Sequence, residues 1–171
     1  MIKNRYKFLP LFLLFFFNIL AATESFPSVF CGKMLDVQNG LVQSNVMIGI
    51  DQGSGKIRSV EFNYSKTDYD DIDTLNLSNY FCLPGLIDMH THISEDHYRP
   101  LVDYLTMTQQ EQIAIGRGLV KKTLLAGFTS VRDLGVYIAW TDKLLRDEIN
   151  AGLTDGPRMQ ISGFYLTIPG G

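Results

Sequence analysis

The sequence predicts an α/β protein in which a small β unit precedes a parallel sheet. Three observations predict this class. Residues 28–83 hold short apolar or β-branched segments separated by turn signals. From Pro84 onward, apolar segments of strand length alternate with segments of helical periodicity. The resulting order of strand, helix and strand is typical of a parallel sheet with right-handed crossovers.

The composition of the 171 residues is that of a globular protein. Apolar residues make up 46% and charged residues 19%, which is too apolar for a disordered chain. The net charge of −3 includes no basic excess, so a nucleic-acid partner is not indicated.

Residues 1–22 are predicted to be a secretory signal peptide. Lys3, Arg5 and Lys7 precede an apolar run over residues 8–20, and small residues follow it. An uncleaved anchor is the alternative, but the run is shorter than the roughly 20 residues that a membrane-spanning helix needs. Cleavage would leave 12 basic and 18 acidic residues, a net charge of −6. We therefore expect an exported protein, periplasmic or secreted, with no attraction to anionic membranes after cleavage.

The chain contains two cysteines, Cys31 and Cys82, in separate expected strands. An oxidising compartment would permit one disulfide between them. Sequence does not give the distance between the strands, so a disulfide and two buried free thiols both stay open.

Residues 23–83 are predicted to form a small antiparallel β unit, the N-terminal part of a β domain. A glycine-rich segment at 51–55 has the residues that a tight hairpin requires. An acidic stretch at 68–73 lacks the EF-hand spacing and is predicted to be a solvated loop rather than a metal loop. The expected strands cover residues 29–37, 46–50, 57–62, 74–77 and 80–83.

Residues 84–171 are predicted to contain about three strands and two helices. The first helix begins at a capping box formed by Thr108 and Glu111 and ends before Gly127. The second helix ends at Gly152 and has an apolar face made of Trp140, Leu144, Leu145 and Ile149. The strands are expected at residues 86–92, 129–131 and 159–162.

The candidate metal ligands are His90 and His92. On a strand, residues i and i+2 point to the same face, with Cα atoms about 6 to 7 Å apart. Neutral imidazoles so placed suit two ligands of one zinc-like ion. The spacing alone is a weak signal, but the pair lies at the carboxyl end of a strand, where parallel α/β folds place their chemistry. Asp88 has the same parity and is a candidate to orient a ligand through a hydrogen bond.

Other polar residues have weaker functional interpretations. His97 follows two acidic residues and is expected to be a solvated loop residue. Arg132 and Asp133 follow the second strand, where Arg132 either faces a substrate or forms an ion pair that braces the rim of the sheet. The sequence contains no serine elbow, phosphate loop or dinucleotide fingerprint.

Three segments resemble the amidohydrolase superfamily. Leu83 to His92 reads Leu-Pro-Gly-Leu-Ile-Asp-Met-His-Thr-His and resembles the first-strand signature of that family. Residues 126–135 resemble the second-strand segment of its imidazolonepropionase-like and prolidase-like branch, and residues 156–163 resemble the approach to its third strand. The preceding β unit is similar to the N-terminal part of the family's small β-sandwich.

This resemblance implies an incomplete (β/α)₈ TIM barrel over residues 84–171, preceded by part of a β-sandwich over residues 23–83. It also implies hydrolysis of carbon–nitrogen bonds by metal-activated water, with one or two divalent ions, commonly zinc, at the mouth of the barrel. His90 and His92 match the family's strand-one ligands. The family's bridging carboxylated lysine, later histidines and final aspartate have no counterpart in this sequence.

A complete barrel needs about 250 residues, so we expect this chain to be the N-terminal portion of an exported, dipeptidase-like amidohydrolase. By itself it is expected to be inactive and prone to aggregation. The expected substrate of the complete protein is a small molecule or dipeptide. The alternatives are a non-catalytic exported remnant, a metal-binding protein of amidohydrolase ancestry, and assembly with a second copy or a complementary fragment.

Overall fold

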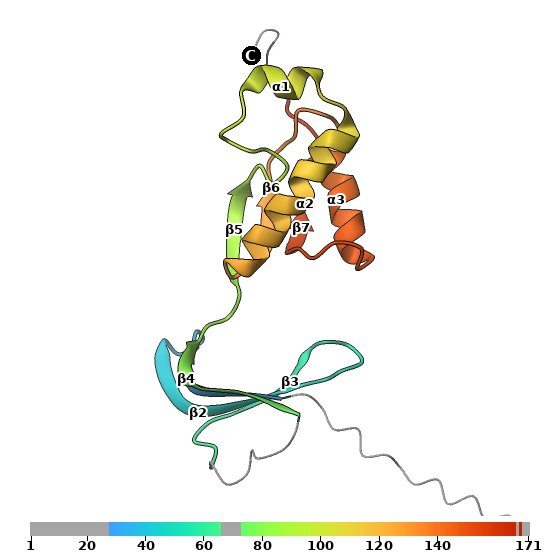
Figure 1. The fold of residues 1–171 in the computed structure, drawn as a ribbon. Helices are drawn as coiled ribbons and strands as arrows, with labels where there is room; N and C mark the ends of the chain where they lie inside the picture. Colours follow the sequence, from blue (N-terminus) through green and yellow to red (C-terminus); the bar gives the residue numbers. More distant parts are fainter. Residues whose placement is uncertain (1–27, 66–72, 167, 169–171) are drawn as a thin grey trace, which may run out of the picture.

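The computed structural model describes residues 28–65, 73–166 and 168. Within them, a four-stranded sheet is followed by a three-stranded sheet, and residues 83–85 connect the two (Figure 1). The predicted signal peptide and most of the acidic stretch at 68–73 lie outside the described residues, so both stay predictions.

The first sheet has the strand order β3-β2-β1-β4. Its strands are β1 (Ser28–Asp36), β2 (Leu41–Ile50), β3 (Ile57–Glu61) and β4 (Thr74–Cys82). The first three strands are antiparallel neighbours, as predicted, but β4 pairs with β1 in parallel. The prediction of a wholly antiparallel unit is therefore wrong at this edge.

Strand β4 also replaces two predicted strands, at 74–77 and 80–83, by one. The register between β1 and β4 shifts after Cys31 pairs with Leu77, so that Lys33 pairs with Phe81. Gly32 lies at this shift, and the backbone of Ser78 occupies the space that a Cβ atom at position 32 would need. Glycine at position 32 thus permits the irregularity in pairing. In the sequence, the same irregularity has the pattern of a break between two strands, at residues 78–79.

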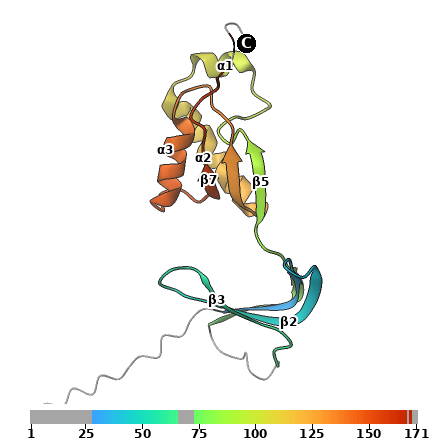
Figure 2. The ribbon, with the colours of Figure 1, turned by 180° about the vertical axis from the view of Figure 1, so that it is seen from behind.

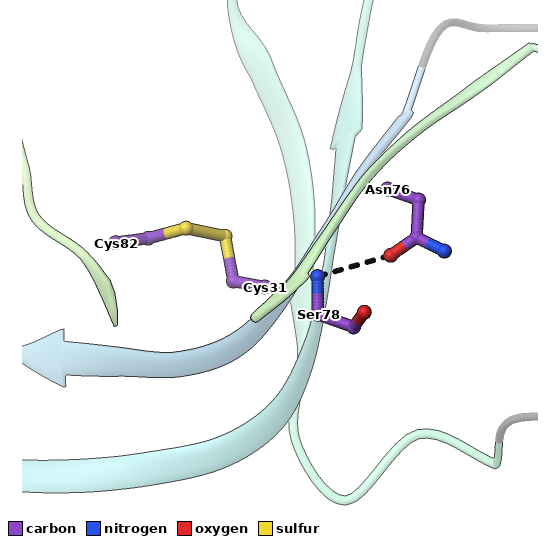
Figure 3. Close-up of a disulfide and its surroundings, with 4 residues drawn as sticks. All are labelled: Cys31, Asn76, Ser78 and Cys82. Atoms are coloured by element: carbon purple, nitrogen blue, oxygen red, sulfur yellow. Dashed lines mark hydrogen bonds between the residues drawn. A yellow bond between two sulfur atoms is a disulfide. The ribbon is translucent and has the colours of Figure 1, made fainter. Parts of the chain in front are cut away.

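A disulfide between Cys31 and Cys82 joins β1 to β4 beside this irregularity (Figure 3). The two Cα atoms lie 6.0 Å apart. On the same stretch of β4, the side-chain oxygen of Asn76 accepts a hydrogen bond from the backbone N–H of Ser78. Of the two alternatives left by the sequence, the structure contains the disulfide.

The second sheet is parallel and has the order β5-β6-β7. Its strands are β5 (Leu86–Thr91), β6 (Phe128–Asp133) and β7 (Arg158–Gln160). Helices α2 (Gln109–Leu125) and α3 (Thr141–Asn150) cover the same face of this sheet (Figure 2). A short helix that was not predicted, α1 (Leu101–Thr106), precedes α2. Helices in the described part of the chain are all too short or too polar to cross a membrane.

The helix signals in the sequence are largely confirmed. Thr108 and Glu111 form the predicted capping box at the start of α2. Gly127 follows the end of α2 with a φ of 96°, a left-handed conformation that favours glycine. Trp140 differs from its prediction, because it precedes α3 as a left-handed N-cap residue instead of belonging to its apolar face.

The core of this second unit lies between the sheet and its helices. It is made of buried side chains from the strands, from both long helices and from the loop after β5: Ile93, Val120, Val131, Leu145 and Met159. The opposite face of the sheet is exposed.

The disulfide generates a prediction about stability. Cys31 and Cys82 are separated by 51 residues, and closing a loop of that size removes chain entropy worth about 4 kcal/mol from the unfolded state. We expect the double substitution Cys31→Ala and Cys82→Ala to lower the free energy of unfolding of the first sheet by up to that amount, measured by urea denaturation. A reductant should destabilise the parent and leave the double variant unchanged. Equal stability of parent and variant without reductant would contradict the prediction.

Candidate active site

The two predicted histidine ligands lie side by side at the carboxyl end of β5. The ring centroids of His90 and His92 are 5.5 Å apart, with 71° between the ring planes. Two imidazoles that bind one zinc ion through nitrogens at about 2.0 to 2.1 Å place their centroids about 5 to 6 Å apart. His90 is exposed and His92 is half-buried. The donor set and the ring separation therefore fit two ligands of one divalent ion.

Hydrogen bonding determines which nitrogen of His92 is free for an ion. Its Nδ1 lies 3.3 Å from the carbonyl oxygen of Gly135 and 2.6 Å from the hydroxyl oxygen of Tyr165. A carbonyl can only accept, so the Gly135 contact assigns the proton to Nδ1. This leaves the lone pair on Nε2 for a metal ion. Metal-binding histidines in proteins are commonly held in this way by a partner of the other nitrogen.

Tyr165 continues this network to a buried carboxylate. Its hydroxyl donates to Oε1 of Glu95 at 3.1 Å and accepts from His92 Nδ1. Burial raises the pKa of Glu95 above its usual value, and burial together with neighbouring Glu95 raises the pKa of Tyr165. Neither residue was predicted to belong to the site. Tyr165 is 73 positions from His92, and only the packing of the loop after β7 brings the two together.

Gly135 has two reasons to be glycine at this position. Its φ is 146°, which side chains rarely adopt. The ring of Tyr165 also lies 2.6 Å from the place where a Cβ atom at position 135 would stand. The residue that fixes the His92 proton is thus also the one that lets the tyrosine ring approach.

Asp133 ties the loops at this end of the sheet together. Its side chain is fully buried, and it accepts hydrogen bonds from the backbone N–H groups of Ile93 at 2.6 Å and Gly135 at 3.1 Å. Burial raises its pKa to about 6, although both N–H groups act in the opposite direction. The carboxylate therefore connects the segment after β5 to the segment after β6.

The predicted roles of Arg132 and Asp88 take a different form in the structure. Among the described residues, Arg132 forms no ion pair; its Nε–H donates to the carbonyl of Met89 at 2.8 Å. The brace at the rim exists, but it joins a side chain to the backbone. Asp88 accepts from the backbone N–H of His90 at 3.0 Å. Its role in orienting a ligand, and the contact of Arg132 with a substrate, stay predictions.

A hollow of about 800 Å³ lies next to His92. Helix α1 and the loops after β6 and β7 line it mainly with apolar and aromatic side chains: Leu101, Leu105, Val136, Tyr137, Ala139, Phe164, Tyr165 and Leu166. His97 is exposed, as expected for a solvated loop residue. In the described ranges of the chain, no group of three or more His, Cys, Asp or Glu side chains is placed to hold a metal ion. The histidine pair therefore offers two ligands of a larger set.

The raised pKa of Asp133 generates a prediction about pH. A carboxyl whose pKa rises from 3.8 to about 6 on folding binds its proton more tightly in the folded state. The free energy of unfolding should therefore fall as pH rises from 4 to 6 and then level off, with a contribution of up to about 3 kcal/mol. Asp133→Asn should remove this part of the pH dependence, measured by urea denaturation from pH 4 to 7.

Glu148 supplies a control of opposite sign. Its ion pair with Arg117 lowers its pKa, so Glu148→Gln should remove a contribution that stabilises the protein at higher pH. If the parent and Asp133→Asn show the same pH dependence, Asp133 is not the group responsible.

Comparison with known proteins places the chain in a family. The sequence pattern described as the amidohydrolase family matches residues 81–169. The solved structure of a Xaa-Pro dipeptidase with bound methionine in its active site is 28% identical, with a TM-score of 0.69; the match covers 83% of this chain and 34% of that one. A prolidase complexed with N-methylphosphonate-L-proline is 25% identical, with a TM-score of 0.67, over 81% of this chain and 32% of that one.

Ochratoxinase from A. niger shares the fold at 21% identity and a TM-score of 0.59, over 79% of this chain and 30% of that one. No protein of curated function matches the chain. The chain spans about a third of the length of the solved structures described above. These matches confirm the predicted fold class, part of a TIM barrel preceded by part of a small β domain. The chain belongs to the amidohydrolase family.

Proposed function

We propose that this chain carries the first two metal ligands, His90 and His92, of a metal-dependent hydrolase that acts on carbon–nitrogen bonds. Membership of the amidohydrolase family supports a hydrolase. The observation that supports the metal assignment is the 5.5 Å separation of the two ring centroids, together with the Nε2 lone pair of His92 that is left free. A zinc or similar ion bound there would lower the pKa of a water ligand and polarise a substrate carbonyl.

The residues of this chain would prepare the site rather than react. Gly135 and Tyr165 hold the His92 ring and keep its proton on Nδ1. The apolar lining of the hollow beside His92 would exclude water from a bound substrate, which strengthens electrostatic interactions there. With two ligands and no general base assigned, we propose that the chain alone is inactive.

We propose a dipeptidase-like activity for the complete protein. The support is the printed identity of two matched structures, a Xaa-Pro dipeptidase and a prolidase bound to a proline analogue. The substrate would then be a dipeptide or a small amide. A non-catalytic remnant of the family is the second candidate, favoured by the small number of ligating residues in the described part of the chain. Dipeptide hydrolysis by soluble, monomeric protein of these 171 residues would overturn the proposed inactivity.

We also propose export to the periplasm or medium. The support is the basic, apolar and small-residue order of the first 22 residues, together with the Cys31–Cys82 disulfide, which forms in oxidising compartments. Cleavage after the small residues would be detected by N-terminal sequencing of protein from the secreted or periplasmic fraction.

Metal binding is the property that tests the site itself. Tag-free protein dialysed against zinc should bind zinc. The double variant His90→Ala and His92→Ala should bind zinc at least about tenfold more weakly, because both imidazole ligands are gone. Elemental analysis after equilibrium dialysis measures this. His97→Ala is the matched control, since it removes the remaining histidine, which is exposed in the loop after β5. Equal zinc in the parent and the double variant would remove the assignment.

A further inference from the structure

The peptide group between Met89 and His90 lies at an irregularity in the pairing of β5 with β6. Asp88 pairs with Val131 and Thr91 pairs with Asp133, so three steps along β5 match two steps along β6. Met89 and His90 of β5 thus lie opposite the single residue Arg132 of β6, so the bulge includes the first histidine. Such a bulge leaves backbone groups without ladder partners and redirects the neighbouring side chain.

Side chains satisfy both polar groups of this peptide. The carbonyl of Met89 accepts from Nε–H of Arg132 at 2.8 Å, and the N–H of His90 donates to Oδ1 of Asp88 at 3.0 Å. Both bonds are exposed to solvent, so each adds a modest net stabilisation, and each is made by an ionised side chain, which strengthens it. Because they form at the bulge, they favour the bulged conformation over a regular strand. Arg132 and Asp88 thus bind the two opposite edges of one peptide group, its C=O and its N–H, and thereby fix the orientation of that group.

Arg132 also holds β5 on the far side of His90. Its backbone carbonyl accepts from the hydroxyl of Thr91 at 3.2 Å, and the Thr91 carbonyl accepts from the N–H of Leu134 at 2.9 Å. Thr91 separates the two histidines in the sequence. Strand β6, which lies beside β5 (Figure 1), therefore fixes the backbone before and after His90 through neighbouring residues.

We propose that Arg132 and Asp88 are positioning residues that clamp the Met89–His90 peptide and so aim the His90 ring at the ion shared with His92. This clamp rests on the proposed function, because it requires the histidines to be ligands. It assigns Arg132 a structural task at the metal site instead of contact with the substrate. His90 is exposed, so packing alone holds its ring weakly, and the clamped backbone supplies the order.

The test is cobalt(II) binding by the full chain, followed by visible absorption, which reports both affinity and coordination geometry. Arg132→Met removes the donor and Asp88→Ala removes the acceptor, and each should weaken cobalt binding about 10- to 100-fold and change the absorption bands. Arg132→Lys keeps a donor and Asp88→Asn keeps an acceptor, so both should recover most of the affinity. These conservative variants also decide the question if either deletion variant fails to fold.

Arg158→Met is the matched control. Arg158 is an arginine on the neighbouring strand β7, and its guanidinium donates to the hydroxyl of Ser130 instead of the β5 backbone. The cobalt affinity and absorption spectrum of the Arg158→Met variant should equal those of the parent. An equal loss in Arg158→Met would reveal general destabilisation and overturn the clamp, as would parental affinity and spectrum in both Arg132→Met and Asp88→Ala.

The double variant His90→Ala and His92→Ala separates the two failures. If it loses cobalt while Arg132→Met and Asp88→Ala keep it, the histidines are ligands and the clamp alone is wrong. If it binds cobalt like the parent, the proposed metal site is wrong and the clamp falls with it.

Discussion

The buried carboxylate of Asp133 is the contact on which the arrangement of the candidate site depends. This carboxylate accepts hydrogen bonds from the backbone N–H groups of Ile93 and Gly135. Ile93 directly follows His92, and the carbonyl of Gly135 contacts His92 Nδ1. One side chain therefore sets both the exit of the chain from β5 and the position of the group that fixes the His92 proton. Because burial raises the pKa of Asp133 to about 6 despite both bonds, ionising it in the folded state has a net cost. Asp133 therefore lowers stability near neutral pH, but its hydrogen bonds define the geometry of the loops at the carboxyl ends of β5 and β6.

The exposed face of the second sheet has the character of a barrel interior. Leu86, Ile87 and Met89 on β5 are 45%, 63% and 50% exposed. Apolar strand residues on the face opposite the helices are normally packed inside a closed (β/α)₈ barrel. Membership of the amidohydrolase family therefore accounts for a surface that would be anomalous on a separate three-stranded protein. Met89 and Arg132 also line this face, so the bond between them joins β5 to β6 on the side away from the helices.

Local chemistry made much of the fold predictable, whereas contacts between distant residues did not. The capping box at Thr108 and the glycine at 127 act within a few residues, so their effect can be read from the sequence. The parallel pairing of β4 with β1 is a tertiary contact, and no turn signal in the sequence predicts it. Helix α1 was missed because its N-cap residue is Pro100, which provides no side-chain cap.

The site follows the same division between local and distant contacts. The His90 and His92 pair was predictable because its spacing is two residues, but the rule behind it assumes a regular strand. The bulge breaks the alternation at Asp88, so parity alone does not place that carboxylate. Tyr165 joins the site from the loop after β7, and nothing in the sequence near either residue indicates its contact with His92.

The proton on His92 also restricts where an ion can lie. With Nδ1 occupied by Gly135 and Tyr165, an ion must approach the opposite nitrogen, Nε2. Two neutral imidazoles bind a divalent ion without neutralising its charge. Their affinity for the ion therefore depends strongly on whether both rings are already fixed in the binding orientation. His92 is held through its own ring, whereas exposed His90 is held through its backbone. Accordingly, Gly135 and Tyr165 contact the Nδ1 atom of His92. Asp88 and Arg132 instead bind the peptide group that precedes His90.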